Sequence, residues 1–323
     1  MELRNKKVFI TGGLGFIGKH LVKKIERDNE VIVYDNFLRG FIDERELTEN
    51  GRSKIVKGDV LDSNLLRKHM AGCDIVFHLA AICGIQSVTQ KPVETIEVNF
   101  LGTHNVLKVA KDLRVERVLV ASTSEVYGQL AFKVDEDTST TQGPISEARW
   151  GYAVSKLATE YLSLAFHNQY GLNVTTVRPF NIYGPGQIGE GAIHNFIVNA
   201  LRDEPIRIYG DGTQIRAWCY IDDLIRGLLL ACSNLKAIGK SFNLGNPQET
   251  ITVYRLAKLI KRITNSKSRI EFVQRRTPVI DVYVRVPDIT RAKELLEFNP
   301  KVSLEEGLPK TIEYYSSISK KSM

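Results

Sequence analysis

Residues 11–18 of this chain read TGGLGFIG, and they follow a short apolar run, KKVFIT, at residues 6–11. The next segment, FIGKHLVKKIERD at 16–28, carries its apolar residues at helical spacing. A glycine-rich turn between a strand and a helix lets the backbone approach a pyrophosphate, and the helix offers its free N–H groups to it. We therefore predict a dinucleotide site at this turn. Its expected contacts are Gly12, Gly15, Phe16, Ile17 and Gly18.

Strands and helices alternate through the first half of the chain. Apolar runs typical of buried strands occur at 30–35, 53–59, 74–81, 117–122 and 173–179, and helical patterns occur near 62–71, 93–112 and 150–169. Such alternation predicts βαβ units and a parallel sheet that helices cover on both faces. The expected fold class is α/β: a Rossmann-type doubly wound parallel sheet with a smaller C-terminal α/β substrate-binding lobe.

The composition of the sequence changes after Pro179, where FNIYGPGQIGEGAIHNF at 180–196 is rich in glycine and turn residues. We expect residues 1–180 to form the dinucleotide-binding Rossmann domain and residues 181–323 to form mainly the substrate-binding lobe. A segment near 217–245 is expected to return to the first domain. No linker or repeat separates the two parts, so we expect them to pack as one unit.

Composition narrows the class of protein. The chain has 323 residues, 43% hydrophobic and 25% charged, which is ordinary for a globular protein. Its formal charge is +7, but the basic residues are scattered, which favours an anionic small molecule over a nucleic acid. No apolar run approaches the ~18 residues that a membrane helix needs, and no signal peptide is visible, so we expect a cytoplasmic protein without membrane contact. Its four cysteines lack metal-ligand spacing, so we expect buried thiols and no metal.

Two carboxylates follow the second and third expected strands. Asp35 ends the run VIVYD, where it would accept hydrogen bonds from an adenosine ribose, and Asp59 ends the next strand, near the expected adenine. Asp35 would repel a 2′-phosphate, which favours NAD over NADP, although Arg39 lies close by in the sequence. The other expected cofactor contacts at strand ends are Asn36, Val60, Leu79, Ala80 and Ala81.

Tyr152 and Lys156 are four residues apart in the expected helix, which brings both side chains onto one face. An ammonium group favours the ionised phenol, whose ordinary pKa is near ~10, so the pair would make a base that works at neutral pH. The same spacing also occurs by chance on helix surfaces. Similarly, the hydroxyls of Thr123 and Ser124 follow a core strand and could simply cap a turn.

Read together, the motifs resemble the extended short-chain dehydrogenase/reductase family, in particular its nucleotide-sugar epimerases, dehydratases and decarboxylases. They are, in order, TGGLGFIG, Asp35, GDV at 58–60, HLAA at 78–81, Asn99, STSEVYG at 122–128, Tyr152 with Lys156, RPFNIYGPG at 178–186 and GDGTQIRAWCYIDD at 210–223. The resemblance spans nearly the whole chain. It implies NAD as cofactor and a nucleoside-diphosphate sugar as substrate, and we expect a homodimer.

The resemblance also implies roles for the matching residues. Tyr152 would take the proton from the sugar C4 hydroxyl while hydride passes to NAD, and Thr123 would hydrogen-bond the same hydroxyl. Lys156 would bind the nicotinamide ribose and lower the pKa of Tyr152. Asn99, in the helix after the fourth strand, would support the lysine side of the site.

Glu125 bears on the reaction that follows oxidation at C4. Dehydratases of this family use a glutamate at this position to remove the C5 proton, so our first expectation is 4,6- or 5,6-dehydration of a hexose, with UDP as the expected carrier. Ser124 departs from the aspartate that many 4,6-dehydratases have there, which leaves the acid for the C6 hydroxyl in doubt.

Three alternatives stay open. UDP-glucuronate decarboxylases share the Thr-Ser-Glu triplet, the segment before Tyr152 and an arginine at the position of Arg285, where it has a catalytic role. Simple 4-epimerases need no carboxylate at Glu125, and a regulatory NAD-binding module would need no reaction at all. In epimerases an arginine near the position of Arg285 binds the diphosphate. The expected substrate contacts are Asn181, Tyr209, Arg216 and Arg285.

Overall fold

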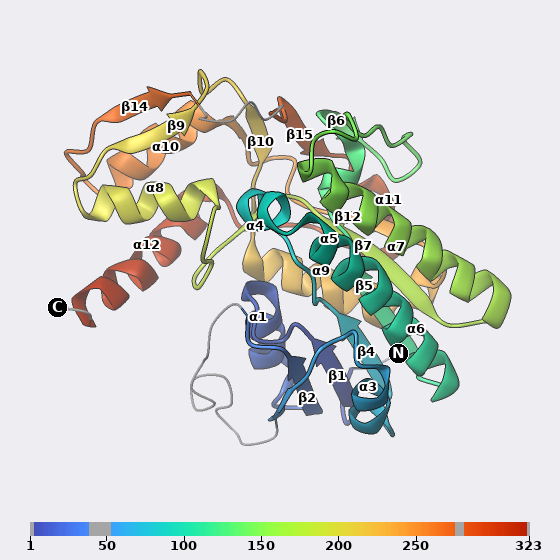
Figure 1. The fold of residues 1–323 in the computed structure, drawn as a ribbon. Coiled ribbons are helices and arrows are strands. Elements are labelled where there is room, and N and C mark those ends of the chain that lie inside the picture. The colour runs from blue at the N-terminus through green and yellow to red at the C-terminus, as the bar shows by residue number, and fades with distance from the viewer. Residues whose placement is uncertain (1–2, 39–52, 275–280, 322–323) are drawn as a thin grey trace.

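The computed structural model describes residues 3–38, 53–274 and 281–321. Its centre is a seven-stranded sheet in the order β12-β7-β5-β4-β1-β2-β3, and every pair of neighbouring strands is parallel (Figure 1). This sheet confirms the predicted doubly wound α/β fold class. The strands are β1 (Lys7–Thr11), β2 (Glu30–Asp35), β3 (Ser53–Lys57), β4 (Ile75–His78), β5 (Arg117–Ala121), β7 (Val174–Pro179) and β12 (Ser241–Leu244).

Helices cover both faces of this sheet because its strands are apolar on both sides. On β1, Val8 and Ile10 join the hydrophobic cluster that contains α1 and α9, whereas Phe9 joins the cluster that contains α3, α6 and α7. This alternation is the period of two that a strand imposes on its side chains. The helices are α1 (Phe16–Ile25), α3 (Ser63–Met70), α6 (Gly102–Asp112), α7 (Arg149–Tyr170) and α9 (Ile221–Ser233).

The single helix expected over 93–112 is interrupted. It consists of α5 (Pro92–Ile96), a π-helical turn, η1 (Glu97–Leu101), and α6, and a further short helix, α4 (Ile85–Gln90), precedes it. Buried Asn99 lies in the π-helical turn, where its side chain hydrogen-bonds to both the N–H and the C=O of Ile82. π-helical turns occur frequently at functional sites, and this one directs Asn99 toward the loop after β4.

The rest of the chain builds a smaller lobe. A four-stranded sheet has the order β13-β10-β15-β6, and two-stranded sheets pair β14 with β9 and β11 with β8. β6 comes from the first half of the chain and pairs in parallel with β15, so the segment after β5 crosses to this lobe. Its strands are β6 (Leu130–Val134), β8 (Ile182–Tyr183), β9 (Ile206–Tyr209), β10 (Ile215–Ala217), β11 (Cys219–Tyr220), β13 (Thr250–Thr252), β14 (Ile270–Val273) and β15 (Val284–Pro287). Its helices are α8 (Ala192–Leu201), α10 (Val253–Ile263), α11 (Thr290–Leu296) and α12 (Leu304–Lys321).

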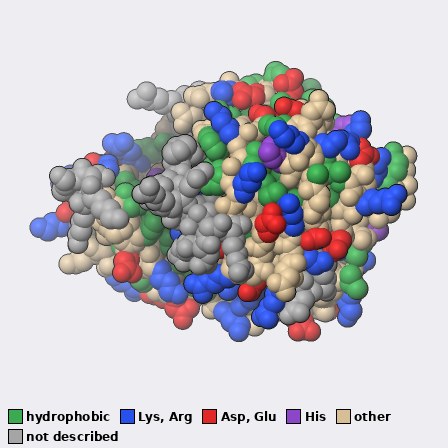
Figure 2. All heavy atoms as spheres, turned by 90° about the horizontal axis from the view of Figure 1, so that it is seen from below, with side chains coloured by type: hydrophobic (Ala, Val, Ile, Leu, Met, Phe, Trp, Pro, Cys, Tyr) green, Lys and Arg blue, Asp and Glu red, His purple; other side chains and the backbone are tan. Residues whose placement is uncertain are grey.

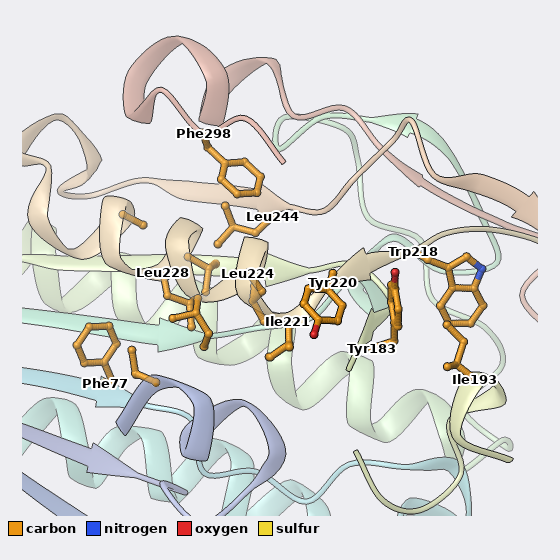
Figure 3. Close-up of a cluster of buried hydrophobic side chains, with 14 of the residues drawn as sticks. Phe77, Tyr183, Ile193, Trp218, Tyr220, Ile221, Leu224, Leu228, Leu244 and Phe298 are labelled. Carbon is orange, nitrogen blue, oxygen red and sulfur yellow. The ribbon is translucent and has the colours of Figure 1, made fainter. Parts of the chain in front are cut away.

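One hydrophobic cluster runs from the large sheet into the smaller lobe. Figure 3 shows Phe77 of β4 near α9, and Tyr183 beside Tyr220, whose rings meet edge-on at 5.5 Å between centroids. Leu244 of β12 and Phe298 belong to the same cluster. β12 belongs to the large sheet and lies within the segment that we expected to return to the first domain. The domain boundary expected at residue 180 stays a prediction.

The surface and the cysteines add two observations. Figure 2 shows basic and acidic side chains intermixed over the face seen from below. Cys73, Cys219 and Cys232 are buried as expected, whereas Cys83 is only partly buried because it lies in the loop after β4.

None of the helices in the described ranges is both long and apolar enough to cross a bilayer.

Candidate active site

The glycine-rich turn between β1 and α1 has a shape that only glycine permits. Gly12 has a φ of +69°, and a Cβ there would lie 2.6 Å from the backbone N of Ala80. A Cβ on Gly18 would lie 2.4 Å from the carbonyl O of Gly12. α1 begins at Phe16, after Gly15, and has no side-chain cap, so the N–H groups of its first turn, including that of Ile17, are available. The turn therefore fits the pyrophosphate of a dinucleotide.

Asp35 lies at the carboxyl end of β2, directly beside this turn. Its Oδ2 accepts a hydrogen bond of 3.0 Å from the N–H of Leu14, and its Oδ1 accepts one of 2.9 Å from the N–H of Phe37. Asn36 Nδ2 donates to Asp59 Oδ2 at 3.3 Å, which links the ends of β2 and β3. These groups fit the ribose side of a dinucleotide. Arg39 lies outside the described residues.

The remaining expected cofactor contacts line the ends of neighbouring strands. Val60 is buried, and the N–H groups of Leu79 and Ala80 donate to the carbonyl and the hydroxyl oxygen of Thr11 at 3.0 and 3.3 Å. Ala81 is partly buried. The residues present thus fit a dinucleotide along its length, and the role of each stays a prediction.

A buried chain of hydrogen bonds connects the glycine-rich turn with α7. Thr103 Oγ1 donates to the carbonyl O of Asn99 at 2.6 Å, so it must accept from His78 Nε2 at 2.9 Å. His78 Nδ1 is then the acceptor for Thr11 Oγ1 at 2.7 Å. Burial lowers the pKa of His78 to about 3, so the ring is neutral. Asn99 in turn donates to Ser155 Oγ at 3.1 Å.

Asn99 supports the expected base through Ser155, the residue next to Lys156. Ser155 Oγ donates to the carbonyl O of Tyr152 at 2.8 Å, so the chain of hydrogen bonds ends at the first turns of α7. The contact that Asn99 makes on α7 is with Ser155, and its support of Lys156 stays a prediction.

Tyr152 and Lys156 lie on one face of α7, as their spacing predicted. Tyr152 is partly buried, and only 2% of Lys156 is exposed. Burial lowers the pKa of Lys156 to about 8, while Cys83 and Glu160 oppose that effect. Below this pKa the lysine carries a positive charge, and a positive charge favours the ionised form of a neighbouring phenol.

The segment after β5 forms a short 3-10 helix, η2 (Ser124–Tyr127). Thr123 is its N-cap, and its Oγ1 accepts from the N–H of Glu125 at 3.2 Å. Ser124 is buried, and Arg285 Nη1 lies 3.5 Å from its Oγ. The turn thus directs Ser124 and Glu125 toward β15 of the smaller lobe.

Two arginines bind the carboxylate of Glu125. Arg285 Nη1 donates to Oε1 at 2.7 Å, and Arg149 Nη2 lies 3.4 Å from Oε2. Burial alone would raise the pKa of Glu125, but Arg285, Arg149 and Arg216 together outweigh burial and hold that pKa below its ordinary value. Glu125 is therefore a stable anion at neutral pH.

The arginines form a compact positive cluster. Arg216 on β10 pairs in register with Arg285 on β15, so both side chains leave the sheet on the same face, and Arg216 Nη2 donates to the carbonyl O of Val282 at 2.6 Å and lies 3.8 Å from Asp281 Oδ1. Burial and, to a smaller extent, the neighbouring Arg285 lower the pKa of Arg216 to about 10. Arg285 is 1% exposed, and its Nε has no hydrogen-bond partner within the described ranges. An anionic ligand would relieve this excess of positive charge.

Two other expected substrate contacts occupy the smaller lobe. Asn181 has a φ of +40°, and its Nδ2 donates to the carbonyl O of Ala217 at 3.0 Å, which holds the segment after β10. Tyr209 ends β9 and is 52% exposed, so its ring is a surface for stacking rather than a core residue. Both assignments stay predictions.

Sequence reasoning missed Arg149. It begins α7, three residues before Tyr152, and its guanidinium lies over the ring of Trp150 at 4.9 Å. One turn of helix places it on the same side as Tyr152, a signal that the spacing alone could have given. Its partner Glu125 could not be inferred, because that contact depends on how η2 meets α7.

Known proteins resemble this chain in sequence and in structure. The UDP-N-acetyl-alpha-D-glucosaminuronate decarboxylase of Bacillus cytotoxicus is 39% identical over 97% of this chain and 98% of its own length. The UDP-glucuronic acid decarboxylase 1 of Arabidopsis thaliana is 38% identical over 95% of this chain and 69% of its own. Among solved structures, the UDP-glucuronic acid 4-epimerase of Bacillus cereus, in complex with NAD and UDP-4-deoxy-4-fluoro-glucuronic acid, is similar with a TM-score of 0.87 and 29% identity, over 97% of this chain and 99% of that one.

The model of the NAD dependent epimerase/dehydratase family matches residues 8–245. This range contains the glycine-rich turn, Asp35, the Thr123–Glu125 segment, Tyr152 and Lys156. The match confirms the family expected from the motifs and, with it, NAD as the cofactor. The chain belongs to the NAD dependent epimerase/dehydratase family.

Proposed function

We propose that this protein is an NAD-dependent enzyme that removes the C6 carboxylate of a UDP-linked hexuronate as carbon dioxide. The observation that carries the proposal is the ion pair of Glu125 with Arg285, with Arg149 and Arg216 beside it. Dehydration, our first expectation from Glu125, becomes the second candidate.

Glu125 is poorly suited to remove a C5 proton. A general base works best when its pKa lies near the working pH, and the arginines hold the pKa of Glu125 below its ordinary value. Ser124 offers a weakly acidic hydroxyl where dehydration would need an acid for the departing C6 hydroxyl. Both features therefore weaken the support for dehydration.

Decarboxylation needs neither a C5 base nor an acid at C6. Once C4 is a ketone, the C6 carboxylate is that of a β-keto acid, so the C5–C6 bond can break and leave its electron pair on the enolate that ends at O4. We propose that Tyr152 and Thr123 hold O4, Tyr152 by taking the C4 hydroxyl proton in the first step. C5 then accepts a proton from the site. NAD, when bound, would accept the hydride from C4 and return it to C4 once C5 is protonated, so that the net change is the loss of carbon dioxide.

The charges around Glu125 suit a substrate whose C6 carboxylate is an anion when it binds and leaves as neutral carbon dioxide. Guanidinium groups of Arg149, Arg216 and Arg285 attract a carboxylate and a diphosphate. A very strong ion pair with the substrate carboxylate would stabilise the ground state and slow the loss of carbon dioxide. The anion of Glu125 already neutralises part of that charge, so the carboxylate can bind without being held too tightly.

The relatives support a hexuronate as substrate. The two relatives compared above are named as decarboxylases of UDP-N-acetyl-alpha-D-glucosaminuronate and UDP-glucuronic acid. The C6 carboxylate is common to both of these sugars. We propose that Arg216 binds the diphosphate, that Tyr209 stacks on the uracil, and that Asn181 holds the segment between them.

A panel of sugars tests this function. The purified protein with NAD is incubated with UDP-glucuronate, UDP-N-acetylglucosaminuronate, UDP-glucose and dTDP-glucose, and the products are weighed by mass spectrometry. We expect loss of carbon dioxide from one or both uronates and no mass change in the neutral sugars. Loss of water from a neutral sugar would instead support dehydration, and a uronate converted without any mass change would support 4-epimerisation.

We also propose that the protein is a homodimer. Val93 and Ile96 on α5 and Val154 and Tyr161 on α7 are exposed apolar side chains, and these two helices pack side by side. A second copy would bury this face. Sedimentation analysis should give a dimer that Tyr161→Glu converts to a folded monomer, and a monomeric wild-type protein would contradict the proposal.

A further inference from the structure

Glu160 and Arg178 form a buried ion pair beneath the catalytic residues. Arg178 Nε donates to Glu160 at 2.9 and 3.0 Å, and Arg178 Nη2 donates to Oε2 at 2.7 Å. Only 3% of Glu160 and 6% of Arg178 are exposed. Removing two charges from water is costly, so a pair at this place calls for a reason other than stability.

The position of Glu160 relates it to the expected base. Tyr152, Lys156 and Glu160 follow one another at intervals of four residues on α7, so they form one stripe of the helix. Glu160 also accepts hydrogen bonds from Ser122 Oγ and, at 3.2 Å, from Ser241 Oγ. The carboxylate therefore joins α7 to the residue that directly precedes Thr123.

Arg178 holds the other end of the same segment. Its Nη1 donates to the hydroxyl of Tyr127 at 2.6 Å, and Tyr127 ends η2. Tyr127 in turn hydrogen-bonds to Asn243 Oδ1 at 2.9 Å. The ion pair thus binds both Ser122 and Tyr127, the two residues that flank Thr123, Ser124 and Glu125.

We propose that Glu160 is a positioning residue with two tasks: with Arg178 it fixes the Thr123–Glu125 segment against the Tyr152–Lys156 face of α7, and it places a negative charge one helical turn from the ammonium of Lys156. This inference rests on the proposed roles of Tyr152 and Lys156. It does not depend on which reaction follows oxidation at C4.

Cys83 and Glu160 are the groups around Lys156 that oppose the effect of burial on its pKa. Tyr152 and Glu160 share its helix, His78 lies on β4, Cys83 lies in the loop after β4, and Arg178 on β7 pairs with Glu160. His78 is neutral, because burial lowers its pKa to about 3. Among these described groups Glu160 is the carboxylate, and it opposes the effect of burial on the pKa of Lys156.

The test measures the protonation of Lys156 directly in the NAD-bound protein without substrate. Carbon-13 NMR of the lysine Cε atoms follows the titration, and Lys156→Met identifies the signal. In the wild type we expect titration near pH 8. In Glu160→Gln we expect titration about one pH unit lower, because a negative charge is lost and Arg178 is left unpaired.

Three further variants separate electrostatics from folding. Glu160→Gln with Arg178→Met removes both charges and should fold well, with Lys156 still titrating below the wild-type value. Glu136→Gln is the matched control, because Glu136 is another buried carboxylate whose side chain contacts Asn243 and Arg291, while its backbone carbonyl, which the substitution keeps, accepts from Arg178. It should leave the titration unchanged. Glu160→Asp keeps the charge but shortens the side chain, so we expect a nearly normal titration with kcat reduced about tenfold or more.

Two results would overturn the inference. An unchanged titration of Lys156 in both Glu160→Gln and the double variant would refute the electrostatic task. Wild-type kcat in Glu160→Asp would refute the positioning task. Because the titration needs no substrate, a wild-type protein that fails to release carbon dioxide would refute the proposed decarboxylation and leave this measurement intact.

Discussion

Arg285 Nη1 donates a hydrogen bond of 2.7 Å to Glu125 Oε1, across 160 residues of sequence. The pair joins the loop after β5 to β15, so it connects the segment that we propose holds the sugar C4 hydroxyl with the smaller lobe. A carboxylate in such a pair is an anion that tunes the local field, which makes an electrostatic role more suitable than proton abstraction.

Glu125→Gln tests this role. The amide still accepts a hydrogen bond from Arg285, but the negative charge is gone, so the arginines should bind the substrate carboxylate more tightly. We expect kcat to fall about 10²-fold and KM to fall with it, because the ground state gains stability that the transition state does not share. Steady-state kinetics on the accepted uronate measure both values.

Deuterated water gives the matching isotopic result for the wild type. Decarboxylation should place deuterium at C5 of the product and leave recovered substrate unlabelled. If Glu125 instead removed the C5 proton, exchange would label the substrate. Labelled substrate together with an unchanged KM in Glu125→Gln would contradict the electrostatic role.

Tyr152→Phe should reduce kcat by about 10²–10⁴-fold with little change in NAD affinity or thermal stability, because only a hydroxyl at the edge of the ring is lost. Lys156→Ala should weaken both turnover and NAD binding. Kinetics and calorimetric titration with NAD measure the two effects. Activity of Tyr152→Phe above about a hundredth of the wild-type rate would remove Tyr152 from its role as the base.

The rate should fall as the pH rises through about 8, because the folded-state pKa of Lys156 lies there and its ammonium is then lost. The free energy of unfolding should not fall over the same pH range. The pKa of Lys156 is lowered from 10.5, so the unfolded chain binds more protons between about pH 8 and 10.5, and the contribution of Lys156 to stability grows over that window. A profile of kcat/KM measured beside thermal unfolding separates the two. A rate that stays constant to pH ~10 would contradict this prediction.

Asp35 should make the protein prefer NAD to NADP, because a 2′-phosphate would meet a carboxylate that already accepts two backbone N–H groups. Asp35→Asn keeps the side chain's shape and removes the charge, so the preference should shrink about tenfold or more. Equilibrium binding of the two nucleotides measures the ratio. Tighter binding of NADP by the wild type would contradict the assignment.

The sequence predicted the parts of the molecule that depend on local patterns. Apolar runs placed the strands of the large sheet within a few residues, and the strand ends brought Asn36 and Asp59 together because carboxyl ends of parallel strands share one edge. The spacing of Tyr152 and Lys156 likewise fixed their common face, because α7 is a regular helix there.

Contacts between distant segments could not be predicted in this way. The pair of Glu125 with Arg285 requires β6 to join β15 in parallel, and no local pattern encodes that register. The π-helical turn at Asn99 depends on side-chain bonds to Ile82, so the sequence read as one continuous helix. Glu160 and Arg178 read as an ordinary helix charge and a strand end, and their pairing emerges only when α7 packs on β7.

The central claim is that the C6 carboxylate leaves as carbon dioxide. UDP-glucuronate and UDP-N-acetylglucosaminuronate carrying carbon-13 at C6 are incubated with the protein and NAD, and the label is followed by NMR. We predict that carbon-13 leaves the accepted sugar and is recovered as bicarbonate in a one-to-one ratio with the nucleotide product. Carbon-13 retained in a nucleotide sugar that has lost water or has inverted at C4 would contradict the account.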